Sequence, residues 1–176
     1  MTDLGAVFDE HVRAEFELRD ADAAVATMTD DAYLIHVPVG TGANGRESLR
    51  RFYAEHFIPA WPDDTSVAPI SRTVGDDRVV DELLVSCTYS RVMDHWLPGI
   101  APTGVRIEMP HVVVTGFRGD KITYEHVYWD QASLLAQIGL VDGARLPLLG
   151  VEQGRNLEQE TASNVLIERA ERAEEP

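Results

Sequence analysis

The chain has 176 residues, of which 30 are acidic and 15 basic, giving a formal net charge of −15. This length, with 44% hydrophobic residues, fits one globular core rather than two. A surface of this charge repels nucleic-acid phosphates and anionic membranes, so we expect neither as a partner. No stretch approaches the roughly 18 apolar residues of a membrane helix. The single cysteine, Cys87, excludes an internal disulfide and a four-cysteine metal site, and it fits a reducing cytoplasm.

The first half of the chain is predicted to form helices with one strand between them. The first helix is expected from apolar residues at steps of four, namely Leu4, Phe8, Val12 and Phe16. A second short helix is expected to end near Met28, and residues 32–38 are a strand candidate. The glycine-rich stretch 40–45 is expected to be a loop, and Asn44 with Glu47 has the spacing of a capping box before a third helix.

The second half of the chain is predicted to form antiparallel strands. Four segments are rich in β-branched and aromatic residues, namely 67–74, 79–91, 105–117 and 122–129. Proline and glycine make residues 93–104 a long ordered loop, and a short helix is expected after Asp130.

Helices followed by strands predict an α+β domain in which helices cover one face of a strongly curved antiparallel sheet that encloses a cavity. We assign residues 1–150 to this domain. Residues 151–176, with seven glutamates and three arginines, are expected to be a charged tail that is helical or disordered. This segment fits either a solvated tail or one that docks onto a partner subunit.

The last two strands suggest a group of polar side chains on one sheet face. A two-residue turn at Gly119-Asp120 pairs His111 with Tyr128 and Val113 with His126. One face then collects His111, Tyr124, His126, Tyr128 and Asp130, while Arg106, Glu108 and Glu125 lie on the other. The alternative is that the first face is simply the solvated one.

Residues 122–139 resemble the C-terminal signature of the SnoaL-like polyketide cyclase family, in which a strand ends at an aspartate before a short helix. The matching positions are Asp130, Leu134, Gln137, Ile138 and Gly139. Upstream, His36, then Gly45-Arg46-Glu47, then Phe52 resemble the same family. The resemblance spans roughly residues 5–140. It implies a cone-shaped fold of the nuclear transport factor 2-like superfamily.

In that family the aspartate matching Asp130 is a general acid/base in intramolecular ring closure, without metal or cofactor. The resemblance therefore implies Asp130 as the catalytic residue, with His126 and His111 as further catalytic candidates beside it. The expected substrate pocket is formed by His36, Tyr128, Tyr124, Tyr53 and Trp96. No histidine pair has metal-ligand spacing on an expected helix, so we predict no metal site. Each of these histidines alone also fits a buried structural role.

Three functions are open on this basis. The first is a cofactor-free acid/base enzyme of the cyclase or isomerase type that acts on a hydrophobic, polyketide-like carbonyl compound. The second is a non-catalytic module of the same fold that binds a small molecule or serves an accessory role. The third is epoxide hydrolase-like water addition, in which Arg106, Glu108 and Asp130 mimic an Asp-Arg-Asp site, although the expected register separates them.

Two further expectations follow from the same residues. A ketosteroid isomerase-like site needs a tyrosine on the first helix, where this chain offers only Phe8 and His11. The resemblance also implies a homodimer, for which the outer sheet face with Arg106, Glu108 and Glu125 is the expected interface.

Overall fold

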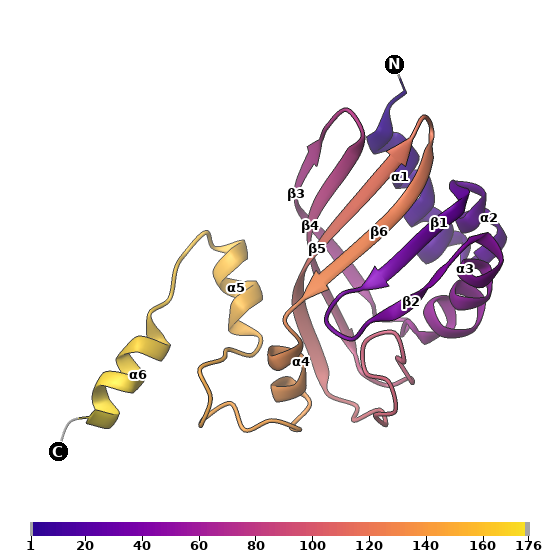
Figure 1. Cartoon of the computed structure of the whole chain (residues 1–176). Helices are drawn as coiled ribbons and strands as arrows, with labels where there is room; N and C mark the ends of the chain where they lie inside the picture. Colours follow the sequence, from indigo (N-terminus) through magenta and orange to yellow (C-terminus); the bar gives the residue numbers. More distant parts are fainter. Residues whose placement is uncertain (1, 175–176) are drawn as a thin grey trace.

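The computed structural model describes residues 2–174 (Figure 1). Its helices are α1 (Leu4–Arg13), α2 (Ala21–Ala26), α3 (Arg46–Phe52), α4 (Gln131–Gln137), α5 (Glu152–Glu158) and α6 (Val165–Glu174). Two π-helical turns, η1 (Ala14–Leu18) and η2 (Tyr53–Phe57), and a 3-10 turn, η3 (Ile58–Ala60), extend α1 and α3. Its strands are β1 (Met28–His36), β2 (Thr41–Asn44), β3 (Ser66–Val74), β4 (Arg78–Thr88), β5 (Arg106–Arg118) and β6 (Lys121–Trp129).

The strands form one curved sheet in the order β2-β1-β6-β5-β4-β3. All neighbouring strands run antiparallel except β1 and β6, which are parallel. The expectation of a wholly antiparallel sheet is therefore wrong at this one pair. No hairpin turn joins β1 to β6, so packing between the two halves of the domain sets their relative direction.

The helices α1, α2 and α3 lie together on one face of the sheet, which confirms the predicted α+β cone (Figure 1). The stripe on α1 is the reason, because Leu4 and Phe8 are buried against the sheet while Asp9 and Glu10 are exposed. Asp3 caps this helix by accepting a hydrogen bond from the amide of Ala6. The face of the sheet away from α1, α2 and α3 is called the outer face below.

Two local expectations in the first half of the chain are wrong. The glycine-rich stretch contains β2, which pairs with β1 through Thr41 and Asn44. The capping box does not form, because the residue that caps α3 is Gly45, which provides no side-chain hydrogen bond. Its φ of 80° belongs to the region that glycine favours.

The register of the β5–β6 hairpin differs from the expected one by a single residue. Arg118 pairs with Lys121 as expected, but Thr123 is bypassed and Gly116 pairs with Tyr124. The bypassed residue forms a β-bulge, and every later side chain of β6 therefore points to the face of the sheet opposite to the expected one. Gly116 makes the bulge feasible, because a Cβ atom there would lie 2.1 Å from the ring of Tyr124.

The C-terminal region follows the sheet as α4, α5 and α6, and α6 extends away from the domain (Figure 1). Gly154 of α5 lies directly against Leu84 and Glu108 on the outer face. Arg169 of α6 donates hydrogen bonds to the carbonyl groups of Gly143 and Leu146. Within residues 2–174, every helix is too short or too polar to cross a bilayer.

Candidate active site

A cavity of about 80 Å³ lies between α1 and the inner face of the sheet. Most of its wall is apolar and comes from residues such as Phe8, Leu34, Phe57, Val85 and Val113. Four of the described side chains that line it are ionisable, namely Glu15, His36, His111 and Glu125. An apolar cavity with a few convergent polar groups is the usual form of a small-molecule site.

Two π-helical turns position Glu15 and Tyr53 at this cavity and beside it. Glu15 lies in the π-helical turn η1, and Tyr53 begins the second π-helical turn, η2. Such turns add a residue to the helix and are frequent at functional sites. Glu125 reaches the cavity through the bulge at Thr123, which turns its side chain inward.

His11, Glu15, Tyr53 and Glu125 form one buried cluster at the cavity wall. The Nε2 atom of His11 lies 3.2 Å from Oε1 of Glu15 and 3.4 Å from Oε2 of Glu125. The hydroxyl group of Tyr53 lies 3.2 Å from the same Nε2 atom and donates to Oε2 of Glu125 at 3.0 Å.

Hydrogen bonding indicates that His11 carries a proton on both ring nitrogens. Its Nδ1 atom lies 2.7 Å from the hydroxyl oxygen of Thr27, and that hydroxyl donates its own hydrogen to the carbonyl of Ala24. Nδ1 must therefore donate, and Nε2 faces two carboxylates that accept. Burial alone lowers the pKa of His11, but the charges of Glu125 and Glu15 outweigh this and raise it well above its usual value.

The pKa values of the two carboxyl groups in the cluster are shifted in opposite directions. Burial raises the pKa of Glu15 above its usual value, and His11 offsets this only in part. Burial acts on Glu125 in the same direction, but the charge of His11 and hydrogen bonds from His11 and Tyr53 outweigh it, so that its pKa is lowered. Two carboxyl groups at one site with pKa values shifted in opposite directions suit the acid and base roles of proton transfer.

The same cluster contains the residues best placed to hold a metal ion within the described part of the chain. The ligand atoms of His11, Glu15 and Glu125 all lie within 4.8 Å of one another. The Nε2 atom of His11 faces both carboxyl groups at hydrogen-bond distance, and its Nδ1 atom donates to the hydroxyl group of Thr27. We therefore interpret the cluster as one that holds protons.

Neutral histidines form another part of the site. Burial lowers the pKa of His95 to about 3 and that of His111 to about 4. Burial also lowers the pKa of His36 well below its usual value. The ring of Trp96 packs against two of them, with its centroid 4.9 Å from that of His111 and 5.4 Å from that of His95.

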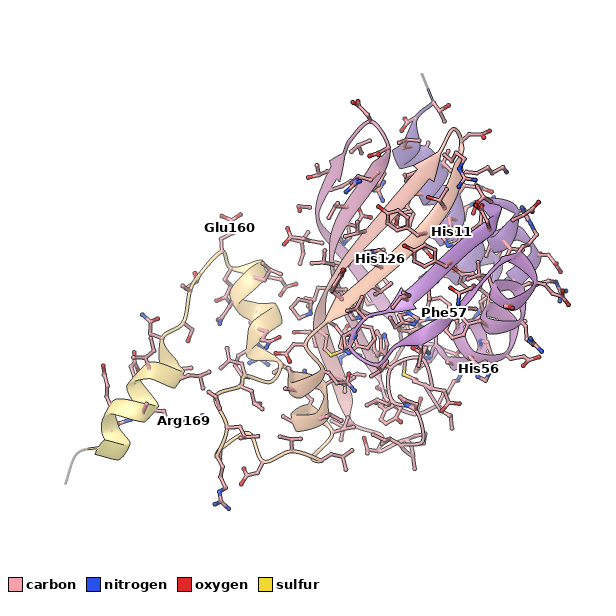
Figure 2. All side chains as sticks on the ribbon, viewed as in Figure 1. His11, His56, Phe57, His126, Glu160 and Arg169 are labelled. Atoms are coloured by element: carbon pink, nitrogen blue, oxygen red, sulfur yellow. The ribbon has the colours of Figure 1, made fainter. Side chains whose placement is uncertain are left out.

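The structure divides the residues predicted for the pocket between the two faces of the sheet. His36, His111 and Trp96 line the cavity, and Tyr53 lies in the buried cluster beside it. The others, namely Tyr124, His126 and Tyr128, belong to the outer face. His126 lies on β6 (Figure 2), and its ring stacks on that of Tyr124 with the centroids 4.6 Å apart. Its Nε2 atom forms a 3.0 Å hydrogen bond with the hydroxyl group of Tyr33. The predicted single face holding His111 and His126 is therefore wrong, because the bulge separates them.

Asp130 lies at the end of β6 and does not line the cavity. Its side chain caps α4 by accepting hydrogen bonds from the amides of Ala132 and Ser133. Its other oxygen accepts a 2.5 Å hydrogen bond from the side chain of Gln153 in α5. These contacts give Asp130 a clear structural role.

Sequence reasoning missed the cluster, although one signal for it was present. His11 and Glu15 are four residues apart and share the face of α1 and η1 that carries Phe8, Val12 and Phe16. Two ionisable residues on an apolar stripe indicate buried polar chemistry. Glu125 carried no such signal, since a one-residue bulge decides which way it points.

Comparison with protein families gives a match over most of the chain. A family model described as a SnoaL-like domain matches residues 8–125. Among curated proteins, no sequence matches this chain.

Solved structures share the fold at low sequence identity. A putative SnoaL-like polyketide cyclase from Jannaschia sp. CCS1 is 19% identical with a TM-score of 0.60, covering 81% of this chain and 98% of that chain. SalBIII, an epoxide hydrolase/cyclase-like enzyme of pyran ring formation in salinomycin, is 20% identical with a TM-score of 0.55, covering 72% and 90%. AclR, a putative hydroxylase from Streptomyces galilaeus, is 16% identical with a TM-score of 0.59, covering 93% and 96%.

Proposed function

The chain belongs to the SnoaL-like family, and on that premise we propose that it is a cofactor-free acid/base enzyme of the cyclase or isomerase type. Its substrate is a compact, largely apolar carbonyl compound bound in the cavity. The observation that carries the proposal is the pair of buried carboxyl groups on the cavity wall, with the pKa of Glu15 raised and the pKa of Glu125 lowered.

The proton transfers balance within this pair. Glu125, as the ionised base, removes a proton from the carbon next to the substrate carbonyl, and Glu15 donates its proton to the carbonyl oxygen. If the enol is conjugated with a second double bond, Glu125 delivers its proton to a remote carbon while the enol hydroxyl returns its proton to Glu15, which is isomerisation. If the enol carbon attacks a second carbonyl, the new alkoxide takes the proton from Glu125 and the enol hydroxyl returns its proton to Glu15, which closes a ring. His11 holds positive charge beside both carboxyl groups, and Tyr53 orients Glu125.

The cavity also limits the size and charge of the substrate. Its volume of about 80 Å³ suits a compact molecule rather than a polycyclic one. Its wall is mainly apolar, and no lysine or arginine among the described lining residues is available to pair with an anionic compound. A neutral carbonyl compound is therefore the best fit.

Asp130 is the residue that the family resemblance implies for this role, and Glu125 replaces it in our proposal. Glu125 is 4% exposed and lines the cavity, whereas Asp130 accepts hydrogen bonds from two backbone amides and from Gln153 outside it. A buried carboxyl group against a substrate cavity is better suited to proton transfer from carbon.

Deuterium exchange of cyclopentanone and cyclohexanone in D₂O tests the proposal, with NMR as the readout. We expect exchange at the carbon next to the carbonyl to exceed the buffer rate and to fall about 10²- to 10⁴-fold in Glu125→Gln. Glu82→Gln is the matched control, because Glu82 lies on the outer face and bonds only Ser71.

Two other outcomes have clear meanings. Ketones that bind without exchange above the buffer rate would support the non-catalytic binding module instead. Exchange that is lost in Asp130→Asn but kept in Glu125→Gln would return the catalytic role to Asp130.

Epoxide opening is a second candidate, and one observation favours it. Protonated His11 lies between the carboxyl groups of Glu15 and Glu125, an arrangement like the Asp-Arg-Asp site of epoxide hydrolases. In this reaction Glu125 would activate water while Glu15 protonates the epoxide oxygen. Hydrolysis of cyclopentene oxide to the diol, measured in the same variants, distinguishes it from ketone exchange.

We also propose that the chain forms a homodimer through its outer sheet face and works in the cytoplasm. Apolar side chains are exposed on that face, including Ile35 at 38% and Tyr128 at 42%. Glu125, expected at this interface, is buried on the inner face and takes no part. Light scattering of the purified chain tests the dimer, and Tyr128→Lys is expected to give a monomer.

A further inference from the structure

The cavity wall contains a hydrogen-bond acceptor that no group within residues 2–174 satisfies. His111 is 4% exposed and lines the cavity, and its Nε2 atom has no partner in that part of the chain. A buried polar atom left without a partner is costly, so such atoms often mark the position of a ligand group.

The hydrogen bond on the other side of the ring fixes what this atom can do. Nδ1 of His111 lies 3.1 Å from the carbonyl oxygen of Met109, and a carbonyl oxygen only accepts, so Nδ1 holds the hydrogen. In a neutral imidazole Nε2 then presents a lone pair. Burial lowers the pKa of His111 to about 4, which keeps the ring neutral. Trp96, stacked at 4.9 Å, and Trp129 at 5.7 Å hold the ring in place.

An unpartnered donor lines the same cavity. Trp61 is 5% exposed, and its indole Nε1–H group has no partner among the residues that the structure describes. Trp96 packs against both residues, since its ring centroid lies 4.9 Å from Trp61 and 4.9 Å from His111. A hydroxyl group both donates and accepts, so it is the small neutral group that suits this wall.

The charged residues at the cavity disfavour an anionic ligand in place of a neutral hydroxyl compound. Among the described residues that line it, Glu15 and Glu125 are acidic and none is lysine or arginine. A carboxylate or phosphate ligand would therefore find no lysine or arginine on the cavity wall, and the nearby cation, protonated His11, is already paired with Glu125.

We propose that the compound bound in this cavity carries a hydroxyl group, and that His111 is the residue that recognises it by accepting its hydrogen. The inference rests on the proposed function only in that the cavity binds the substrate. It adds a hydroxyl group to the compact carbonyl compound and assigns a specificity residue.

Binding of phenol, its isostere toluene and the acceptor-only anisole tests the proposal. All three tryptophans lie around the site, so their indole N–H signals report binding by NMR. We expect phenol to bind roughly 5- to 10-fold more tightly than toluene or anisole. The ¹⁵N signal of His111 Nε2 should shift with phenol and stay in place with toluene.

His111→Phe keeps a ring beside Trp96 and removes the acceptor, so phenol should no longer bind more tightly than anisole. His56→Phe is the matched control, because the side chain of His56 is exposed and does not line the cavity. If His111→Phe does not fold, the ¹⁵N shift in the unmodified chain decides alone.

Equal affinity for phenol and toluene, or an unchanged Nε2 signal with bound phenol, would overturn the proposal. Tighter binding of anisole than of phenol would also overturn it, because the donor Trp61 would then select the ligand. These are binding measurements, whereas loss of ketone exchange in Glu125→Gln tests turnover, so the two proposals fail separately.

Discussion

Tyr53 donates a 3.0 Å hydrogen bond to Oε2 of Glu125 and so joins the turn after α3 to the last strand of the sheet. Both side chains are buried, and His11 lies within 3.4 Å of the same carboxylate oxygen. A base held by two donors is kept ionised and fixed in direction, which is what proton abstraction at a defined carbon requires.

Tyr53→Phe is expected to move the acidic limb of the pH profile of kcat/KM to higher pH. The hydroxyl group helps to lower the pKa of Glu125, so its removal raises that pKa and the base ionises later. Ketone exchange measured between pH 4 and 8 checks this. Tyr33→Phe is the control, because Tyr33 bonds His126 on the outer face. A limb that stays in place would contradict the role given to Tyr53.

Asp130→Ala is expected to reduce the free energy of unfolding by about 1 kcal/mol, while Asp130→Asn changes it little. Asp130 caps α4 through two backbone amides, and asparagine accepts such bonds nearly as well as aspartate. Urea unfolding measures both variants. Equal stability of the alanine variant and the unmodified chain would exclude this capping role.

Acid is expected to destabilise the fold partly through His111. Its pKa is lowered in the folded state from 6.5 to about 4, so the neutral form is favoured there. The resulting stability is present above pH 6.5 and is lost as the pH falls toward 4. Between pH 7 and 4, His111→Phe should therefore lose about 3 kcal/mol less than the unmodified chain. Urea unfolding at the two pH values gives the difference, and parallel losses would contradict it.

Gly116→Ala is expected to destabilise the hairpin by about 1–3 kcal/mol. A Cβ atom at this position would lie 2.1 Å from Cε1 of Tyr124, and both residues belong to strands that the bulge joins. Thermal unfolding measures the cost. The same substitution in a Tyr124→Ala background should cost less, and an equal cost in both backgrounds would show that the contact is not responsible.

Removal of divalent metal ions is expected to leave ketone exchange unchanged. His11 donates from both ring nitrogens, so protons occupy the position that a metal ion would need between Glu15 and Glu125. Dialysis against EDTA followed by the exchange assay checks this, and added Zn²⁺ should inhibit by displacing the proton on Nε2. Activity that is lost with EDTA and restored by a metal ion would contradict proton-based catalysis.

Much of the fold could be predicted because local pattern specifies it. Apolar residues at steps of four gave α1, and β-branched segments gave four of the strands to within a few residues. The parallel pairing of β1 with β6 could not be predicted, since no turn joins these strands. The site was predicted only in part: His36, His111 and Trp96 line the cavity, and Tyr53 lies in the buried cluster beside it. The rest could not be predicted, because successive side chains of a strand alternate between faces, and the one bypassed residue on β6 moves all later side chains to the opposite face.

The sequence by itself determined the SnoaL-like α+β cone, since helix and strand periodicities and the residues around Asp130 are local properties that survive any register. Only the tertiary structure decided which ionisable groups meet. His11, Tyr53 and Glu125 come from three separate parts of the chain, and their shifted pKa values arise from mutual proximity and burial, which no single segment contains.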